Sequence, residues 1–145
     1  MLAKITAVTT LALLTSSSAL AAAGDCHAIS GTYVNHNVPC AVPALACVES
    51  QVTGGLAGVS TTVVTTFDPV THTFSGTVTN VVDNGAVVTS TIVGTLVNGV
   101  GHSVETITGG TRQFAHATGT IVTGSGNGVG AYTGEYCLGN GGHGD

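Results

Sequence analysis

The strongest indication of this chain's fold lies in the stretch Ile107-Thr108-Gly109-Gly110-Thr111-Arg112-Gln113-Phe114-Ala115-His116-Ala117-Thr118-Gly119. Adjacent glycines such as Gly109 and Gly110 enter turn conformations without a steric penalty, so they predict a turn. The flanking segments, 102–108 and 116–123, are rich in Thr, Val and Ile, which favour strands. This stretch therefore predicts two strands joined by a turn.

The same arrangement recurs along the chain. Asn-Gly, the strongest short hairpin signal, occurs at Asn84-Gly85, Asn98-Gly99 and Asn127-Gly128, and Asp68-Pro69 marks a further turn. The expected strands cover 28–36, 48–56, 58–67, 72–82, 86–97, 102–108, 116–123 and 130–137. Only 38–47, which contains two prolines, has the composition of an irregular loop, and no helical period appears in the mature chain. The sequence therefore predicts an all-β protein.

A recurring glycine motif favours closure of these strands into a barrel. The pattern apolar-x-Gly-x-apolar is centred on Gly31, Gly76, Gly94, Gly119 and Gly134. Because side chains alternate across a strand, each glycine shares the apolar side, where it permits sharp coiling. We therefore expect an eight-stranded antiparallel up-and-down β-barrel. A β-sandwich and a β-solenoid are the alternatives, although the unequal spacing of the glycines does not fit a solenoid repeat.

Residues 107–119 resemble the signature Gly-Gly-Thr/Ser-Gly-x-Phe-x-x-Ala-x-Gly of plant dirigent proteins and allene oxide cyclases. The resemblance implies an eight-stranded antiparallel β-barrel, and its cyclase members imply an apolar pocket that steers a reactive intermediate without a cofactor. No catalytic or pocket residue of the family maps onto this motif. Arg112 stands at the third glycine of the signature; if that position has a positive φ, an arginine there is strained and the turn is rearranged.

The chain is also similar to a group of small bacterial exported proteins. These proteins carry an early cysteine, a cysteine pair around a proline-containing loop, and a final Tyr-Thr-Gly-x-x-Cys, which is residues 132–137 here. The resemblance implies export and a disulfide-containing barrel, and it implies no particular activity.

The N-terminal segment 1–23 has the parts of a secretory signal peptide. Lys4 supplies a positive charge, the apolar run 5–14 is too short to span a bilayer, and Ala-x-Ala cleavage sites end at Ala23. We expect cleavage and a secreted or periplasmic location.

The mature chain is expected to form a single β-barrel domain at 24–138 and a flexible Gly-rich tail at 139–145. A lipid anchor on Cys26 is the alternative to a free mature protein. Asp25, directly before that cysteine, does not suit lipid attachment, so we expect no membrane insertion after cleavage.

The charge balance restricts the partners. Lys4 and Arg112 are the only Lys and Arg residues, against seven Asp and Glu, and Lys4 leaves with the signal peptide. Nucleic acids require phosphate-neutralising cations, and anionic membranes attract basic surfaces, so neither is an expected partner. Any ligand is expected to be a small apolar or neutral molecule. The sequence does not indicate an oligomeric state.

All four cysteines lie in the mature chain, and an even number in an exported protein predicts disulfides. Cys40 and Cys47 bracket the expected loop. Cys26 precedes the first strand and Cys137 ends the last, and these two strands are neighbours in a closed barrel. We therefore predict the pairs Cys40–Cys47 and Cys26–Cys137. Zinc binding is the alternative, but there is no Cys-x2-Cys pair and the histidines are scattered, so we expect neither metal nor cofactor.

Candidate site residues are few. Glu105 shares one side of its strand with Ser103 and Ile107. If that side faces inward, desolvation raises the pKa of Glu105, which then suits a catalytic acid or base. An outward carboxylate on a polar face is the alternative. The ligand-binding candidates are Tyr33, Arg112, Tyr132 and Tyr136.

Three classes of function agree with these observations. The first is a non-catalytic exported barrel that binds a small molecule or another protein. The second is a cofactor-free isomerase or cyclase of the allene oxide cyclase kind. The third is a structural protein with a filled interior. The sequence leaves open whether the protein is an enzyme, and an interior cavity of a few hundred Å³ would separate the first two classes from the third.

Overall fold

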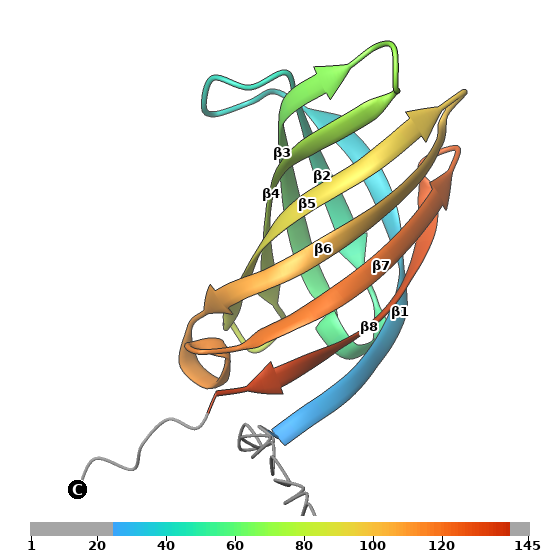
Figure 1. The fold of residues 1–145 in the computed structure, drawn as a ribbon. Helices are drawn as coiled ribbons and strands as arrows, with labels where there is room; N and C mark the ends of the chain where they lie inside the picture. Colours follow the sequence, from blue (N-terminus) through green and yellow to red (C-terminus); the bar gives the residue numbers. More distant parts are fainter. Residues whose placement is uncertain (1–24, 140–145) are drawn as a thin grey trace, which may run out of the picture.

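The structure, a computed structural model, describes residues 25–139 and shows eight strands closed into a barrel (Figure 1). In chain order the elements are β1 (Asp25–Val38), β2 (Ala46–Val52), η1 (Gly54–Leu56), β3 (Gly58–Asp68), β4 (Thr73–Val82), β5 (Val87–Val97), β6 (Val100–Gly110), η2 (Arg112–Phe114), β7 (Thr118–Gly126) and β8 (Val129–Leu138). Each strand pairs antiparallel with the next, and β8 pairs with β1.

The predicted eight-stranded antiparallel up-and-down β-barrel is therefore confirmed. The closed ring excludes the sandwich and solenoid alternatives. The expected signal peptide, 1–23, and residues 140–145 of the expected Gly-rich tail lie outside the described residues.

The Asn-Gly pairs form turns of two kinds. The φ angles are 51° and 77° at Asn98-Gly99, and 54° and 80° at Asn127-Gly128. Positive φ at both central residues defines the type I′ turn, whose twist matches the flanking strands. At the third pair, by contrast, only Gly85 has a positive φ, and Asn84 Oδ1 accepts the N–H of Ala86 at 2.9 Å. The side chain of Asn84 therefore supports a longer connection between β4 and β5.

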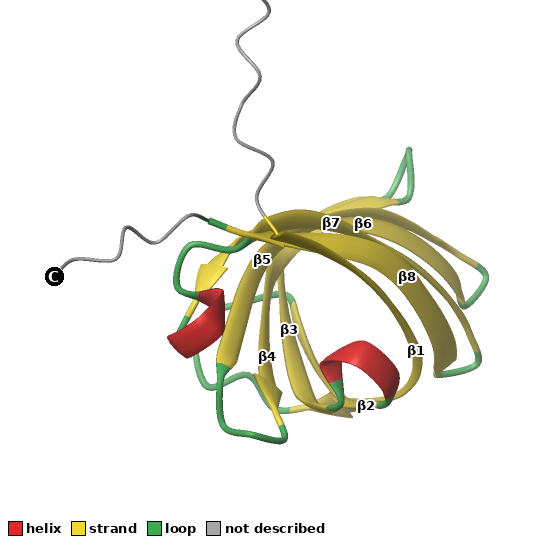
Figure 2. Ribbon diagram, turned by 90° about the horizontal axis from the view of Figure 1, so that it is seen from below, coloured by secondary structure: helices red, strands yellow, loops and turns green. Residues whose placement is uncertain are grey.

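The connection between β2 and β3 differs from the expected strand over 48–56. β2 ends at Val52, and Gly54–Leu56 form the short helical turn η1. This turn and η2 both lie at the end of the barrel that is viewed in Figure 2. The chain leaves the strand here because η1 brings an apolar side chain into the barrel end, where Leu56 is buried.

Contacts with a distant strand hold η1 in place. The Tyr132 hydroxyl of β8 accepts the Leu56 N–H at 2.9 Å and donates to the Thr53 carbonyl at 2.8 Å. Gly31 of β1 lies against the same turn, since a Cβ there would be 2.0 Å from the Thr53 oxygen. Only glycine permits so close a backbone approach. These partners are remote in sequence, so no local pattern indicates them.

The turn expected at Gly109-Gly110 is displaced. Both glycines belong to β6 and pair with β5, and the chain reverses instead through η2. Arg112 has a φ of 52°. This is the positive φ that was considered above for the third glycine position of the signature. Its Nη1 donates to the Asn84 carbonyl, which ties η2 to the β4–β5 connection and offsets the strain.

An apolar core fills the end of the barrel where η1 and η2 lie. Its buried members are Ile29, Leu56, Val82, Ala86, Val88, Ile107, Phe114, Ala117, Ile121 and Tyr132. The ring of Phe114 meets that of Tyr136 edge to face, with centroids 5.2 Å apart. Because this core closes one end, any site inside the barrel must open toward the other end.

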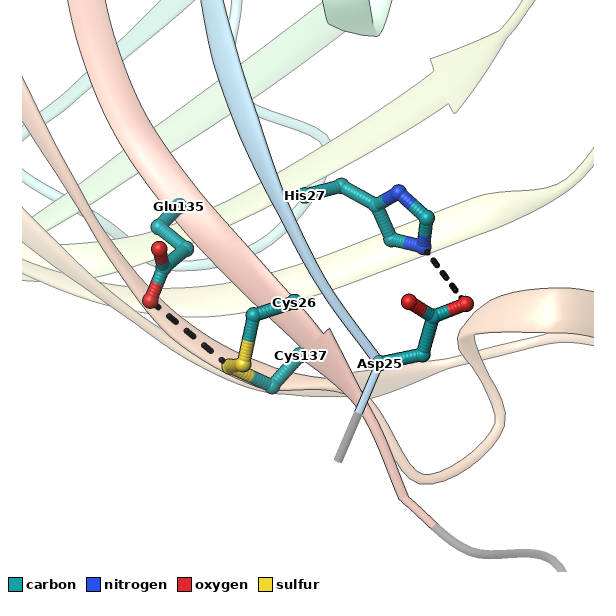
Figure 3. Close-up of a disulfide and its surroundings, with 5 residues drawn as sticks. All are labelled: Asp25, Cys26, His27, Glu135 and Cys137. Carbon is teal, nitrogen blue, oxygen red and sulfur yellow. Dashed lines mark hydrogen bonds and ion pairs between the residues drawn. A yellow bond between two sulfur atoms is a disulfide. The ribbon is translucent and has the colours of Figure 1, made fainter. Parts of the chain in front are cut away.

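Both predicted disulfides are confirmed. Cys26 and Cys137 are direct cross-strand partners, and their bond joins β1 to β8 (Figure 3). Cys40 and Cys47 close the connection between β1 and β2. The first bond links the two ends of the described chain at the seam of the barrel, and the second clips a loop beside its open end.

Candidate functional site

A cavity of about 610 Å³ occupies the barrel beyond the apolar core, and inward-facing residues of all eight strands line it. Val52, Leu56, Val88 and Ile121 form its apolar floor. Its mouth carries Leu45, Phe67, Phe74 and Leu96. A cavity of this volume lies within the usual range for small-molecule sites. The interior of the barrel is therefore hollow, which the sequence could not establish.

A polar row crosses four neighbouring strands on one wall of the cavity. Asn35, Ser50, Ser60 and Asn80 are direct cross-strand partners in β1, β2, β3 and β4, and all four line the cavity. Ser50 Oγ donates to Asn35 Oδ1 at 2.7 Å, and Asn80 Nδ2 donates to the Leu56 carbonyl at 3.0 Å. Asn80 Oδ1 is buried and has no hydrogen-bond partner among the described residues. A buried acceptor without a partner costs free energy, so Asn80 is a destabilising element of this wall.

A second polar group lies on β5, β6 and β7 and contains the acidic candidate. Ser103 and Thr123 share a hydrogen bond of 2.6 Å between their hydroxyls. Ser90 Oγ donates to Glu105 Oε2 at 2.9 Å. Glu105 therefore faces the cavity, and the outward alternative considered for this residue does not hold.

The surroundings of Glu105 disfavour its charged form. Desolvation raises the pKa of this carboxyl above its ordinary value, and the hydrogen bond from Ser90 opposes this only in part. Arg112, the single Lys or Arg between residues 25 and 139, lies outside the cavity, where it bonds the Asn84 carbonyl. Glu105 thus has no cationic partner from Lys or Arg, and at low pH it is a neutral hydrogen-bond donor.

Replacing Glu105 with glutamine is expected to stabilise the fold near neutral pH and to have less effect near pH 4. Because the folded-state pKa is raised above 4.5, the unfolded carboxyl loses its proton first as pH rises. The free energy of unfolding of the wild type therefore falls between the two pKa values, and glutamine removes that fall. Urea unfolding across this pH range measures the difference.

The matched control is Glu135→Gln, which removes the same charge from an exposed position on β8. It is expected to show no comparable gain near neutral pH. If Glu105→Gln raised the free energy of unfolding equally near pH 4 and near neutral pH, the result would contradict the desolvation of Glu105.

The four ligand-binding candidates separate into two pairs. Tyr33 and Tyr132 line the cavity, and the hydroxyl of Tyr132 is already engaged with the η1 turn. Burial raises the pKa of Tyr132, so its hydroxyl stays protonated near neutral pH. Tyr136 packs in the closed end between Phe114 and His27, and Arg112 lies outside the cavity. The structure therefore brings Tyr33, Tyr132 and Glu105 together and leaves Tyr136 and Arg112 elsewhere.

Asn80 and Ser90 line the cavity but were not among the residues expected from the sequence, although the sequence carries a signal for both. Asn80 is in phase with Phe74, Gly76 and Val78, and side chains two residues apart in a strand share a face. The glycine motif that marks the inward face of β4 therefore also marks Asn80 as inward. The same reasoning assigns Ser90 of β5 to the cavity.

Cys26, Glu135 and Cys137 bring three candidate metal-ligand atoms close together on the outside of the barrel (Figure 3). Both sulfurs are joined in the disulfide, so neither is a thiolate that could bind a metal. The contact of 3.8 Å between Cys137 Sγ and Glu135 Oε1 is van der Waals in nature, because a disulfide sulfur carries no hydrogen to donate. This cluster is a disulfide with a neighbouring carboxylate.

Comparisons with models of known families, with curated proteins and with solved structures find no match to this chain. In residues 25–139, none of the helical segments has the length and apolar character needed to cross a bilayer. The cavity and the groups that line it are therefore the features that bear on function.

Proposed function

We propose that this protein is an exported barrel that binds a small, largely apolar molecule in its cavity. The observation that carries the proposal is the hollow interior of about 610 Å³, with an apolar floor and an apolar mouth. A purely structural barrel needs no such space, because close packing of the interior is more stable. The two disulfides support an oxidising, extracytoplasmic location.

Binding of the neutral fluorophore N-phenyl-1-naphthylamine tests the proposal. Ser60 faces the cavity from β3, so Ser60→Phe fills that space and is expected to weaken binding at least about tenfold. The neighbouring Thr61 is exposed on the outer face, so Thr61→Phe adds the same ring outside and is expected to bind like the wild type. Fluorescence titration gives the dissociation constants.

Circular dichroism and denaturant unfolding establish that both variants are folded. A folded Ser60→Phe protein that binds the fluorophore as tightly as Thr61→Phe would contradict binding inside the barrel. Absence of saturable binding by the wild type, together with failure of a panel of neutral apolar compounds to raise its melting temperature, would favour a structural role.

A cofactor-free isomerase or cyclase is the second candidate, and Glu105 is the observation that favours it. A carboxyl with a raised pKa inside an apolar cavity suits proton transfer to or from a bound intermediate. The resemblance of residues 107–119 to allene oxide cyclases supports the same reading. Incubation with an unsaturated epoxide, followed by chiral chromatography, is expected to give a single cyclised stereoisomer with the wild type and a racemic product with Glu105→Gln.

A further inference from the structure

The carboxyl of Glu105 keeps unused acceptor positions inside the cavity. The hydroxyls of Ser50, Ser90 and Ser103 are all engaged with neighbouring side chains. Asn80, which is 6% exposed, uses its amide N–H on a backbone carbonyl and keeps Oδ1 unpaired. Among the described residues, only Ser90 donates to the carboxyl of Glu105. The carboxyl of Glu105 can therefore accept further hydrogen bonds from donors on a ligand.

The charged residues of the cavity lining also favour a ligand that donates hydrogen bonds to Glu105. Of the residues in 25–139 that line it, Glu105 is the only acidic one, and none is Lys or Arg. The other titratable residues along its lining are Tyr33, His102 and Tyr132. His102 is exposed and lies three residues before Glu105 on the same strand, so the two side chains project to opposite faces. An ionised Glu105 is thus a lone charge in a largely apolar space, and a cationic group on a ligand would compensate it.

We propose that the cavity takes a small apolar amine in its protonated form, with the ammonium group paired to the Glu105 carboxylate. The inference rests on the proposed function and narrows its ligand class. An ammonium group supplies three donors and one positive charge, and it matches a carboxylate that has unused acceptor positions and no Lys or Arg beside it. The apolar floor and mouth accept the hydrocarbon part. A carboxylate ligand of the same length is repelled by the ionised carboxyl of Glu105.

Displacement of N-phenyl-1-naphthylamine by three eight-carbon probes tests this assignment near neutral pH. The probes are octylamine, octanol and octanoate, which share a chain and differ in the head group. We expect octylamine to displace the fluorophore at a concentration at least about tenfold lower than octanol, because charge-assisted hydrogen bonds are about twice as strong as neutral ones. Octanoate is expected to be the weakest.

Two variants that each lose one negative charge distinguish binding of octylamine at Glu105 from a general attraction of octylamine to an acidic protein. Glu105→Gln is expected to lose the preference for octylamine over octanol. Glu135→Gln removes a charge from the outer face of β8, and it is expected to keep the wild-type preference. Equal loss of the preference in both variants would show that octylamine responds to net charge, and it would overturn the assignment.

A measurement on the wild type keeps the proposal testable even if Glu105→Gln does not fold. As pH falls through the titration of Glu105, the preference for octylamine over octanol is expected to disappear, since octylamine stays protonated while the carboxylate is lost. A preference that stays constant down to pH 4, or that is absent near neutral pH while octanol still displaces the fluorophore, overturns the inference. If neither the fluorophore nor octanol binds at all, the proposed function itself has failed.

Discussion

Replacing Cys26 and Cys137 together with serine is expected to cause one of the two largest losses of stability among the changes considered. The disulfide closes a loop with a sequence separation of 111 residues at the β1–β8 seam. A covalent tie across so long a loop removes many conformations from the unfolded chain. The chain-entropy model gives a loss of about 4.8 kcal/mol in the free energy of unfolding. Urea unfolding of the purified variant and wild type measures it.

The matched control is the pair Cys40→Ser and Cys47→Ser. This bond has a sequence separation of only 7 residues, for which the same model gives about 2.5 kcal/mol. The order of the two losses is therefore the informative result. A larger loss on removing the Cys40–Cys47 bond would contradict the prediction that the Cys26–Cys137 bond, which closes the longer loop, restricts the unfolded chain more.

Replacing Phe114 with alanine is expected to lower the free energy of unfolding by about 3–5 kcal/mol. Phe114 ends η2, is 4% exposed, and packs against the ring of Tyr136 in the closed end of the barrel. Alanine leaves a void that the surrounding strands can fill only in part, because pairing around the closed barrel fixes their positions. Thermal and urea unfolding both measure the change.

Phe67→Ala is the same chemical change at a position that is 44% exposed at the cavity mouth. Its expected cost is about 1 kcal/mol, since much of the ring already contacts water. Fluorophore binding adds a second readout: Phe67→Ala alters the mouth, whereas Phe114→Ala acts on the closed end. Equal losses of stability at the two positions would contradict the assignment of the apolar core to the barrel end where η1 and η2 lie.

Side-chain alternation explains how far the candidate site could be predicted. The parity that puts Ile107 inward also puts Glu105 inward, and the glycine motif of β4 does the same for Asn80. Side-chain alternation does not predict the hydrogen-bond partner of Glu105. The Ser90 hydroxyl that donates to Glu105 comes from another strand, 15 residues away in the sequence. Which carboxyl is desolvated and which is exposed therefore depends on strand pairing.

The sequence by itself determined the features that depend on local chemistry. Alternating Thr and Val residues with Asn-Gly turns specified antiparallel strands, and the position of Cys26 and Cys137 at the two ends of the strand series specified their pairing once closure was assumed. The tertiary structure alone decided the rest. The Tyr132–Leu56 contact, which bridges 76 residues, turns η1 inward to close one end, and the small inward residues then leave the other end hollow. Cavity volume depends on how eight strands coil and which side chains meet across the barrel, and no short segment carries that information.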